Sequence, residues 1–212
     1  DLALQAIAQD GRPRGVHVAP RSLLAPGFAR AVLARLKAAP AAAQQLSIEW
    51  AEQPEVVHAT PAPPAPTAPP GAAGAPSIGA SALAAGGLPG PAAAALREAV
   101  PAWRRLGVRV GVEHAGGSPR TLPALKELGI DYVKVDARHL AGAADDAVAR
   151  NHVESLVALI HGLELAAIAE GVADARQLGL VWELGFDGAT GPAVVPAGES
   201  TPGTAAHLEP AA

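Results

Sequence analysis

Apolar and polar residues follow two different periods along this 212-residue chain. Runs that alternate residue by residue, as half-buried β-strands do, occur at 14–19, 46–50, 108–113, 131–136, 165–170 and 186–190. Between these runs the apolar residues recur every three or four positions, as on one face of a helix. One such stripe consists of Val153, Leu156, Val157, Ile160 and Leu163. The pattern therefore predicts six strand–helix repeats and a parallel β-sheet.

The ends of the predicted helices are marked by residues that favour helix termini. Gly129 follows one apolar stripe and is typical of a helix end. Asp174 is expected to cap a later helix, which Gly185 ends. The residues of this helix that we expect to face the core are Leu178, Val181 and Trp182. Periodicity alone leaves two architectures open for the sheet, an open doubly wound sheet and a barrel.

One segment interrupts the repeats. Residues 58–93 consist almost wholly of Ala, Pro, Gly, Ser and Thr. Such a segment buries too little side chain to offset the entropy of ordering it, and its prolines disfavour regular structure. We expect a disordered Ala/Pro-rich insertion between the second strand and a helix at 92–105, with a Pro-rich partner-binding motif as the alternative.

Composition narrows the classes of function. The formal net charge is −4 and no basic cluster is present, which argues against nucleic acid as a partner. The chain has no cysteine, so thiolate metal sites and disulfides are excluded. No apolar run has the length of a membrane span and no secretory signal opens the sequence. We therefore expect a cytoplasmic domain, or the cytoplasmic part of a membrane-anchored receptor, cut from a longer protein.

Charged residues stand at or beside the carboxyl ends of the predicted strands. They are Glu49, Glu113, Lys134, Asp136 and Glu170. The carboxyl ends of parallel strands form the face on which a β/α barrel collects its active site. The third strand, moreover, ends in Glu113-His114 and runs into a glycine-rich turn. The sequence therefore predicts a polar site on this face.

Several motifs give the chain a family resemblance. "VHVAPRSLL", "LSIEWAE", "LGVRVGVEHAGG", "LKELGIDYVKVD", "IAEGVADARQL" and "ELGFDGATGP" fall in the order and spacing of the EAL-domain family, over about residues 1–57 and 102–196. That family comprises cyclic-di-GMP phosphodiesterases and their inactive relatives. The resemblance implies an α/β, TIM-like barrel in residues 1–196, interrupted by 58–93 and followed by a flexible tail at 197–212. The first two strands and the Glu-Ala-Leu signature are absent, so we expect a partial barrel of six strands.

The resemblance also assigns roles to single residues. Glu49, Glu113 and Glu170 match metal ligands of the family, in a vestigial form. Arg21, Lys134 and Asp136 join them as the residues expected to contact cyclic-di-GMP, and Glu52 matches a loop glutamate of the family. Four other family positions, where the family has Asn, Asp, a carboxylate and Gln, are occupied here by His17, His114, Ala173 and Thr190. Imidazole nitrogen is a poor ligand for the hard ions Mg²⁺ and Mn²⁺.

These replacements favour a catalytically inactive domain, with no cofactor expected and Mg²⁺ or Mn²⁺ only if the domain is active. The first hypothesis is a cyclic-di-GMP receptor or scaffold, similar to LapD-type membrane receptors and acting with a protein partner or an upstream signalling domain. The second is a protein-interaction domain that no longer binds the nucleotide, and the third is an active phosphodiesterase. For His114 a role as zinc ligand or general base stays open, and Lys134 either meets a phosphate or neutralises Glu113 and Glu170.

Overall fold

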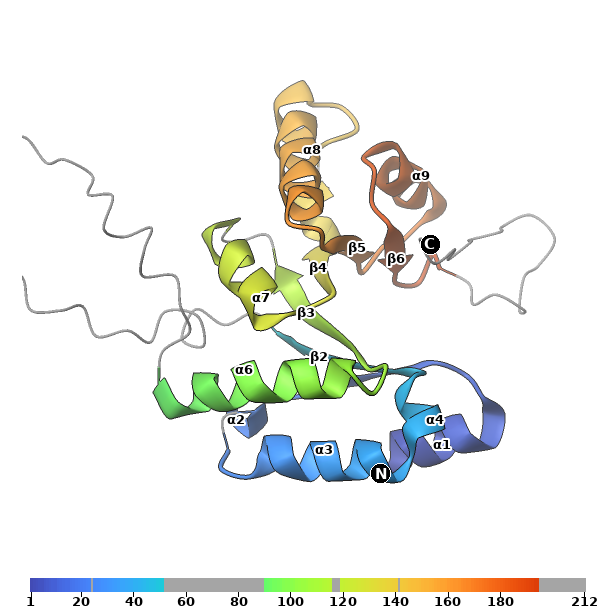
Figure 1. Ribbon diagram of the computed structural model, residues 1–212. Coiled ribbons are helices and arrows are strands. Elements are labelled where there is room, and N and C mark those ends of the chain that lie inside the picture. The colour runs from blue at the N-terminus through green and yellow to red at the C-terminus, as the bar shows by residue number, and fades with distance from the viewer. Residues whose placement is uncertain (24, 52–89, 116–118, 141, 195–212) are drawn as a thin grey trace, which may run out of the picture.

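Strands and helices alternate along the chain in the computed structural model, which describes residues 1–23, 25–51, 90–115, 119–140 and 142–194 (Figure 1). The strands are β1 Arg14–His17, β2 Leu46–Ala51, β3 Arg109–Ala115, β4 Tyr132–Asp136, β5 Ala166–Glu170 and β6 Gly188–Thr190. The α-helices are α1 Leu2–Asp10, α2 Pro20–Leu23, α3 Phe28–Ala38, α4 Pro40–Ala43, α6 Gly90–Arg104, α7 Leu122–Leu128, α8 Ala147–Gly162 and α9 Ala175–Glu183. Two short 3₁₀ helices are η2 Pro119–Thr121 and η3 Ala137–Leu140.

The six strands form one parallel sheet in the order β1-β2-β3-β4-β5-β6. Each strand pairs with the next one along the chain, so the order contains no reversal of the kind that defines a doubly wound sheet. The helices are arranged around the outside of the strands (Figure 1). The prediction of a partial, TIM-like barrel with six parallel strands is therefore confirmed.

The predicted insertion is partly wrong at its carboxyl end. Helix α6 begins at Gly90, so residues 90–93 are helical and do not belong to the insertion. The segment that starts α6 is rich in alanine, which is the best helix former. Pro91 lies in the first turn, where a backbone N–H has no partner within the helix, so proline is tolerated there. The rest of the insertion, Glu52 and the tail at 197–212 lie outside the described residues.

Four helix-to-strand junctions share one local pattern. A leucine is followed by a residue with positive φ, then by a buried apolar residue, and then by the start of the next strand. The residues with positive φ are Gly107 at 87°, Gly129 at 87°, Glu164 at 55° and Gly185 at 82°. The apolar residues that follow them are Val108, Ile130, Leu165 and Phe186, all buried. These four junctions therefore share a left-handed turn residue and a buried apolar residue ahead of the strand.

The core lies between the outer face of the sheet and the helices. Val110 and Val112 of β3 and Val133 and Val135 of β4 are almost fully buried and point outward from the sheet. Their neighbours in sequence point to the inner face, because side chains alternate along a strand. Among the helices of the described residues none has the length and apolarity to cross a membrane.

Helix α9 confirms part of its predicted orientation. The side chain of Asp174 accepts a hydrogen bond from the backbone N–H of Gln177, as expected of an N-cap. Leu178 and Val181 are buried, but Trp182 is 40% exposed, so its predicted inward position is wrong. The buried face also includes Leu180 and extends from Leu178 past Val181 to Leu180, whereas Trp182 lies about 200° from Leu180 around the helix.

Candidate polar site at the carboxyl ends of the strands

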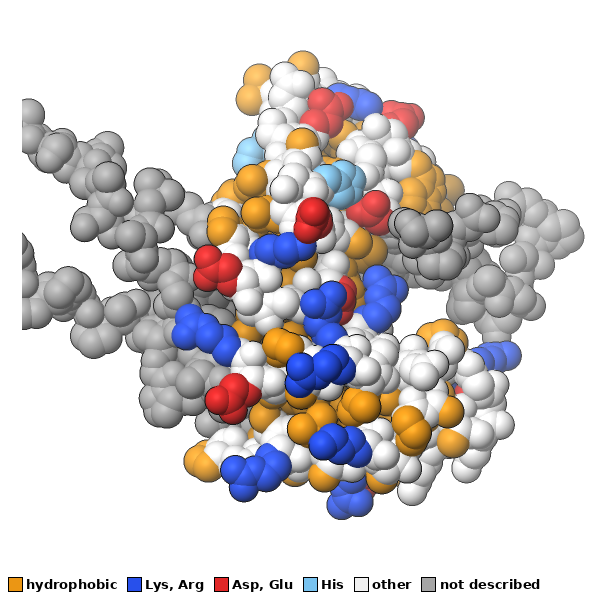
Figure 2. All heavy atoms as spheres, in the orientation of Figure 1, with side chains coloured by type: hydrophobic (Ala, Val, Ile, Leu, Met, Phe, Trp, Pro, Cys, Tyr) orange, Lys and Arg blue, Asp and Glu red, His pale blue; other side chains and the backbone are white. Residues whose placement is uncertain are grey.

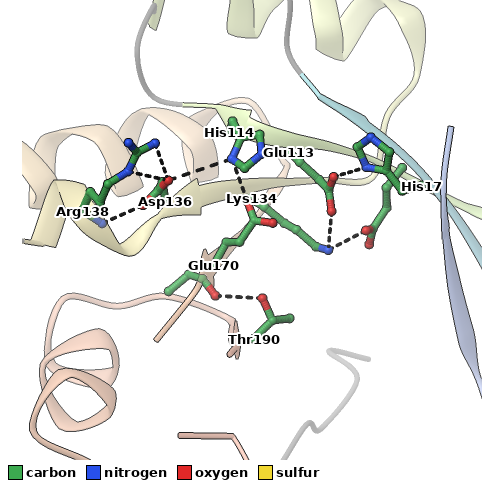
Figure 3. A network of polar contacts seen from close by, with 10 residues as sticks. His17, Glu113, His114, Lys134, Asp136, Arg138, Glu170 and Thr190 are labelled. Carbon is green, nitrogen blue, oxygen red and sulfur yellow. Dashed lines mark hydrogen bonds and ion pairs between the residues drawn. The ribbon is translucent and has the colours of Figure 1, made fainter. Parts of the chain in front are cut away.

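The inner face of the sheet carries a connected polar cluster at the carboxyl ends of the strands (Figure 3). Its centre is Lys134 of β4, whose Nζ donates to Glu49 Oε2 at 2.5 Å and to Glu113 Oε1 at 3.1 Å. The Lys134 side chain is only 12% exposed, and both glutamates are buried. The prediction that Lys134 neutralises Glu113 matches this arrangement, but its second partner is Glu49 and not Glu170.

Two more side chains complete the bonding of these carboxylates. The hydroxyl of Tyr132 donates to Glu49 Oε1 at 2.5 Å, and His17 Nδ1 contacts Glu113 Oε2. Each of the four carboxylate oxygens of Glu49 and Glu113 thus has a partner from within the protein. The cluster is satisfied by the chain's own cation and hydrogen-bond donors.

The sequence analysis missed the role of Tyr132. A Cβ atom added to Gly111 of β3 would lie 2.3 Å from the Tyr132 ring, so the ring rests directly on the glycine. Gly111 interrupts an otherwise Val-rich strand, which is a signal of close approach by another group. Tyr132 also shares its face of β4 with Lys134 and Asp136, because the three residues alternate. These two signals mark Tyr132 as a residue of the inner face, but they do not identify Glu49 as its partner.

The ionisation of the cluster follows from its contacts. Burial acts to raise the pKa of the Glu113 carboxyl, but its hydrogen bonds with neighbouring side chains, Lys134 and His17 among them, and the Lys134 charge outweigh it, so the pKa lies below its usual value. Burial acts to lower the pKa of Lys134, yet its bonds to the two glutamates raise it. Burial, followed by the bond to Glu49, raises the pKa of Tyr132. Lys134 and Glu113 are therefore both charged at neutral pH.

A second group of polar residues lies beside this cluster, around His114. The β3–β4 register shifts between Val112 and Ala115, and His114 has a φ of 58°. Such a bulge re-aims a side chain, and a non-glycine residue at positive φ is held there at some energetic cost. The Nδ1 atom of His114 lies 3.3 Å from Glu170 Oε2 and 4.0 Å from Asp136 Oδ2. Glu170 Oε2 is buried and lacks a partner of good hydrogen-bond geometry, so this contact is electrostatic.

Asp136 is held mainly by the residue two positions later. The Arg138 guanidinium contacts Asp136 Oδ2 at 2.7 Å, and the Arg138 backbone N–H donates to Asp136 Oδ1 at 2.8 Å. These hydrogen bonds lower the pKa of Asp136 against a smaller effect of burial. Thr190, which stands at the position of the family's glutamine, donates its hydroxyl to the carbonyl of Ala169 at 3.5 Å.

The predicted metal ligands are divided between the two groups. Ligand atoms of Glu113, His114 and Glu170 lie within 4.8 Å of one another and form the candidate metal cluster in the part of the chain that the structure describes. Glu49, the third predicted ligand, belongs instead to the bonds around Lys134 and Tyr132. A pair of Mg²⁺ or Mn²⁺ ions does not fit this set, because the His114 imidazole takes the place of a hard oxygen donor and Glu49 and Glu113 are already bonded to Lys134.

A cavity of about 380 Å³ lies on the inner face of the sheet, and two of the predicted binding residues, Glu49 and Lys134, line it. All six strands contribute to its wall, through His17, Glu49, Arg109, Lys134, Ile168 and Thr190. The predicted residues Glu113, Asp136 and Glu170 are not part of this wall. Arg21 lies on α2, and its side chain is outside the described part of the structure.

Comparison with known proteins agrees with the motifs. The sequence profile of the family described as "EAL domain" matches residues 89–197, which is half of the chain. The chain belongs to the EAL-domain family. A protein of Azorhizobium caulinodans, described as uncharacterized, is 28% identical over 88 residues, covering 42% of this chain and 12% of its own.

Solved EAL-domain structures share the fold. The chain resembles an EAL-domain protein of Listeria monocytogenes (19% identity, TM-score 0.61) over 87% of this chain and 61% of that one. The EAL domain of FimX from Pseudomonas aeruginosa, solved with cyclic-di-GMP bound, has 17% identity and a TM-score of 0.61, over 87% of this chain and 62% of that one. A GGDEF-EAL structure of Vibrio cholerae LapD, also bound to cyclic-di-GMP, has 20% identity and a TM-score of 0.61, over 86% of this chain and 37% of that one. The chain thus spans less than two thirds of the length of these structures.

Proposed function

We propose that this EAL domain is catalytically inactive and binds cyclic-di-GMP as a receptor or signalling scaffold. The observation that carries the proposal is the position of Lys134 between Glu49 and Glu113. A buried ammonium satisfies both carboxylates, and a divalent cation placed beside it would be repelled. The two carboxylates therefore have their hydrogen-bond partners without a metal.

Replacements around the site support the same conclusion. His17 and His114 bring nitrogen to positions where the family has oxygen ligands, while Ala173 and Thr190 replace a carboxylate and an amide. No step of phosphodiester hydrolysis is assigned to these residues, because the donor set does not fit the ions that this chemistry needs. The bound nucleotide would be held and not cleaved.

The cavity on the inner face is where we place the ligand. The proposed contacts are Arg21, Glu49, Glu113, Lys134, Asp136 and Glu170. Lys134 is bonded to two carboxylates and also lines the cavity, so a phosphate would approach it from the cavity side. Arg138 is 85% exposed beside Asp136 and offers a second positive charge at the mouth.

Binding and turnover can be separated by experiment. Calorimetric titration of the chain with cyclic-di-GMP, with and without Mg²⁺, should show binding in both conditions. Chromatography of the same samples, also repeated with Mn²⁺, should show no linear dinucleotide. Metal-dependent product that disappears in Glu49→Ala would make the domain an active phosphodiesterase and refute the proposal.

A second candidate is a protein-interaction domain that has lost the nucleotide. The exposure of Trp182 on α9 at 40%, and of Val148 on α8 at 77%, favours it, because large apolar side chains in water are enriched at interfaces. Absence of any cyclic-di-GMP binding in the titration supports this candidate. By likeness to the LapD arrangement, we further propose a cytoplasmic position next to an upstream signalling domain, with a protein partner.

A further inference from the structure

A second cavity, of about 510 Å³, lies at the opposite ends of the strands from the polar cluster. Three arginines line it: Arg104 at the end of α6, Arg105 directly after it, and Arg109 at the start of β3, which also borders the first cavity. Pro101, Val108 and Asp131 are further parts of the wall. Figure 2 shows Lys and Arg side chains gathered across the middle of the face in view. We call this cavity the arginine pocket.

The arginine pocket has more positive than negative charge. Asp131 is fully engaged, because Arg104 Nη2 contacts its Oδ1 at 2.7 Å and the Val110 N–H donates to its Oδ2 at 2.8 Å. Arg109 lies over the Tyr132 ring, 5.1 Å from its centroid, and Arg105 points into solvent. Within the residues that the structure describes, neither Arg105 nor Arg109 has a carboxylate partner. Two positive charges are therefore left without compensation.

The repeated helix-to-strand junction shows which residues stand elsewhere at the position of Arg109. At two of the other three junctions the residue after the buried apolar position is an aspartate, Asp131 or Asp187, and at the third it is an alanine. Each aspartate bonds a backbone N–H of the preceding strand and a side chain of the helix before that strand. The partners are Val110 and Arg104 for Asp131, and Ala167 and His161 for Asp187. Arg109 makes neither bond, and its positive charge lies beside two other arginines.

We propose that the arginine pocket is a second ligand site, which binds the doubly charged phosphate of a small molecule, as a phosphate monoester or a pyrophosphate. Guanidinium groups bind phosphate oxygens in pairs of hydrogen bonds, and a dianion balances the two free charges. A phosphate collects several donors at one point, whereas the carboxylates of an acidic peptide are spread along a chain. The volume is that of a small-molecule site, and Pro101 and Val108 offer an apolar wall.

Calorimetric titration of the whole chain in metal-free, low-salt buffer tests the proposal, with sodium pyrophosphate in one arm and phenyl phosphate in the other. We expect saturable binding in at least one arm: pyrophosphate alone indicates a free anion as ligand, and tighter phenyl phosphate indicates an organic ester. Arg105→Gln should weaken binding about tenfold, which is the loss of one charged hydrogen bond. Arg105→Gln is the key variant because the Arg105 side chain has no contact in the described structure whose loss would unfold the protein.

Two controls separate this site from others. Arg30→Gln on α3, an exposed arginine with no ion-pair partner in the described residues, should leave the affinity unchanged. Arg176→Gln on α9, whose side chain is exposed and lies far along the chain from the three arginines of the pocket, should leave it unchanged as well. Dissociation constants weaker than roughly 10 mM in both arms, or an unaltered affinity in a folded Arg105→Gln/Arg109→Gln double variant, overturn the proposal.

Discussion

Replacing Lys134 by methionine tests the polar cluster most directly. The substitution keeps the apolar stem and removes the ammonium that contacts Glu49 at 2.5 Å and Glu113 at 3.1 Å. Both carboxylates are buried, so they are left as neighbouring negative charges with little water. Removing one partner of a buried ion pair lowers the free energy of unfolding by about 3–5 kcal/mol. Because the cavity admits some solvent, we expect a loss of about 2–4 kcal/mol in the free energy of unfolding.

Urea denaturation followed by circular dichroism measures this loss, and Lys126→Met is the matched control. Lys126 contacts Glu164 at 3.0 Å, but the two side chains are 37% and 86% exposed. Exposed pairs contribute at most about 1 kcal/mol, so the control should stay close to the parent protein. Adding Glu49→Gln to Lys134→Met should recover part of the stability, because one of the uncompensated charges is then gone.

The same variant separates a structural from a ligand-binding role of Lys134. If Lys134 also contacts a phosphate, a folded Lys134→Met protein should bind cyclic-di-GMP about ten- to a hundredfold more weakly, which corresponds to about 1.5–3 kcal/mol. Unchanged affinity removes Lys134 from the proposed ligand site. A loss of stability below about 0.5 kcal/mol, no larger than in the control, refutes the electrostatic reasoning itself.

Three further changes have expected outcomes. Gly111→Ala should destabilise the chain by about 1–3 kcal/mol in urea denaturation, because the new Cβ would lie 2.3 Å from the Tyr132 ring; a neutral result would mean that the ring is free to move. Glu164→Gly should raise the free energy of unfolding by about 0.5–1 kcal/mol, because Glu164 has a φ of 55°, which glycine adopts without strain. Glu154→Gly within α8 should lower it by about 1 kcal/mol, and equal effects of the two changes would contradict the strain at Glu164. Because the folded pKa of Glu113 is lowered, its contribution is complete above the unfolded value of about 4.3 and is lost as the pH falls through the folded pKa. Denaturation midpoints across acid pH should therefore fall more steeply for the parent than for Glu113→Gln, and parallel curves would contradict this.

The sequence predicts the framework of the fold well for a physical reason. Each strand and helix has its own period, and Gly129 and Asp174 mark helix ends through local backbone and side-chain bonding that needs no distant partner. The gathering of Glu49, Glu113 and Lys134 also follows from local information, because parallel strands end at one edge of a sheet. These features depend on neighbours along the chain or on sheet direction alone.

The partners within the site depend on distances that no local pattern contains. Lys134 meets Glu49, two strands away, and not Glu170 on the adjacent strand. His114 is re-aimed by a register shift in β3 that the run of valines does not announce. Tyr132 resembles an ordinary core residue until Gly111 is known to lie beneath its ring. Trp182 is exposed because the buried face of α9 extends from Val181 toward Leu180, on the side away from Trp182.

The polar cluster has a mechanical consequence. Backbone hydrogen bonds join each strand to its neighbour, but His17 of β1 reaches Glu113 of β3, and Glu49 of β2 reaches Lys134 of β4. Contacts between strands that are two apart in the sheet draw these strands together on the inner face and so support the curvature of the sheet. Lys134 thus ties β2 to β4 across β3, so the ammonium that bonds the two carboxylates also fixes the distance between two strands that the backbone does not pair.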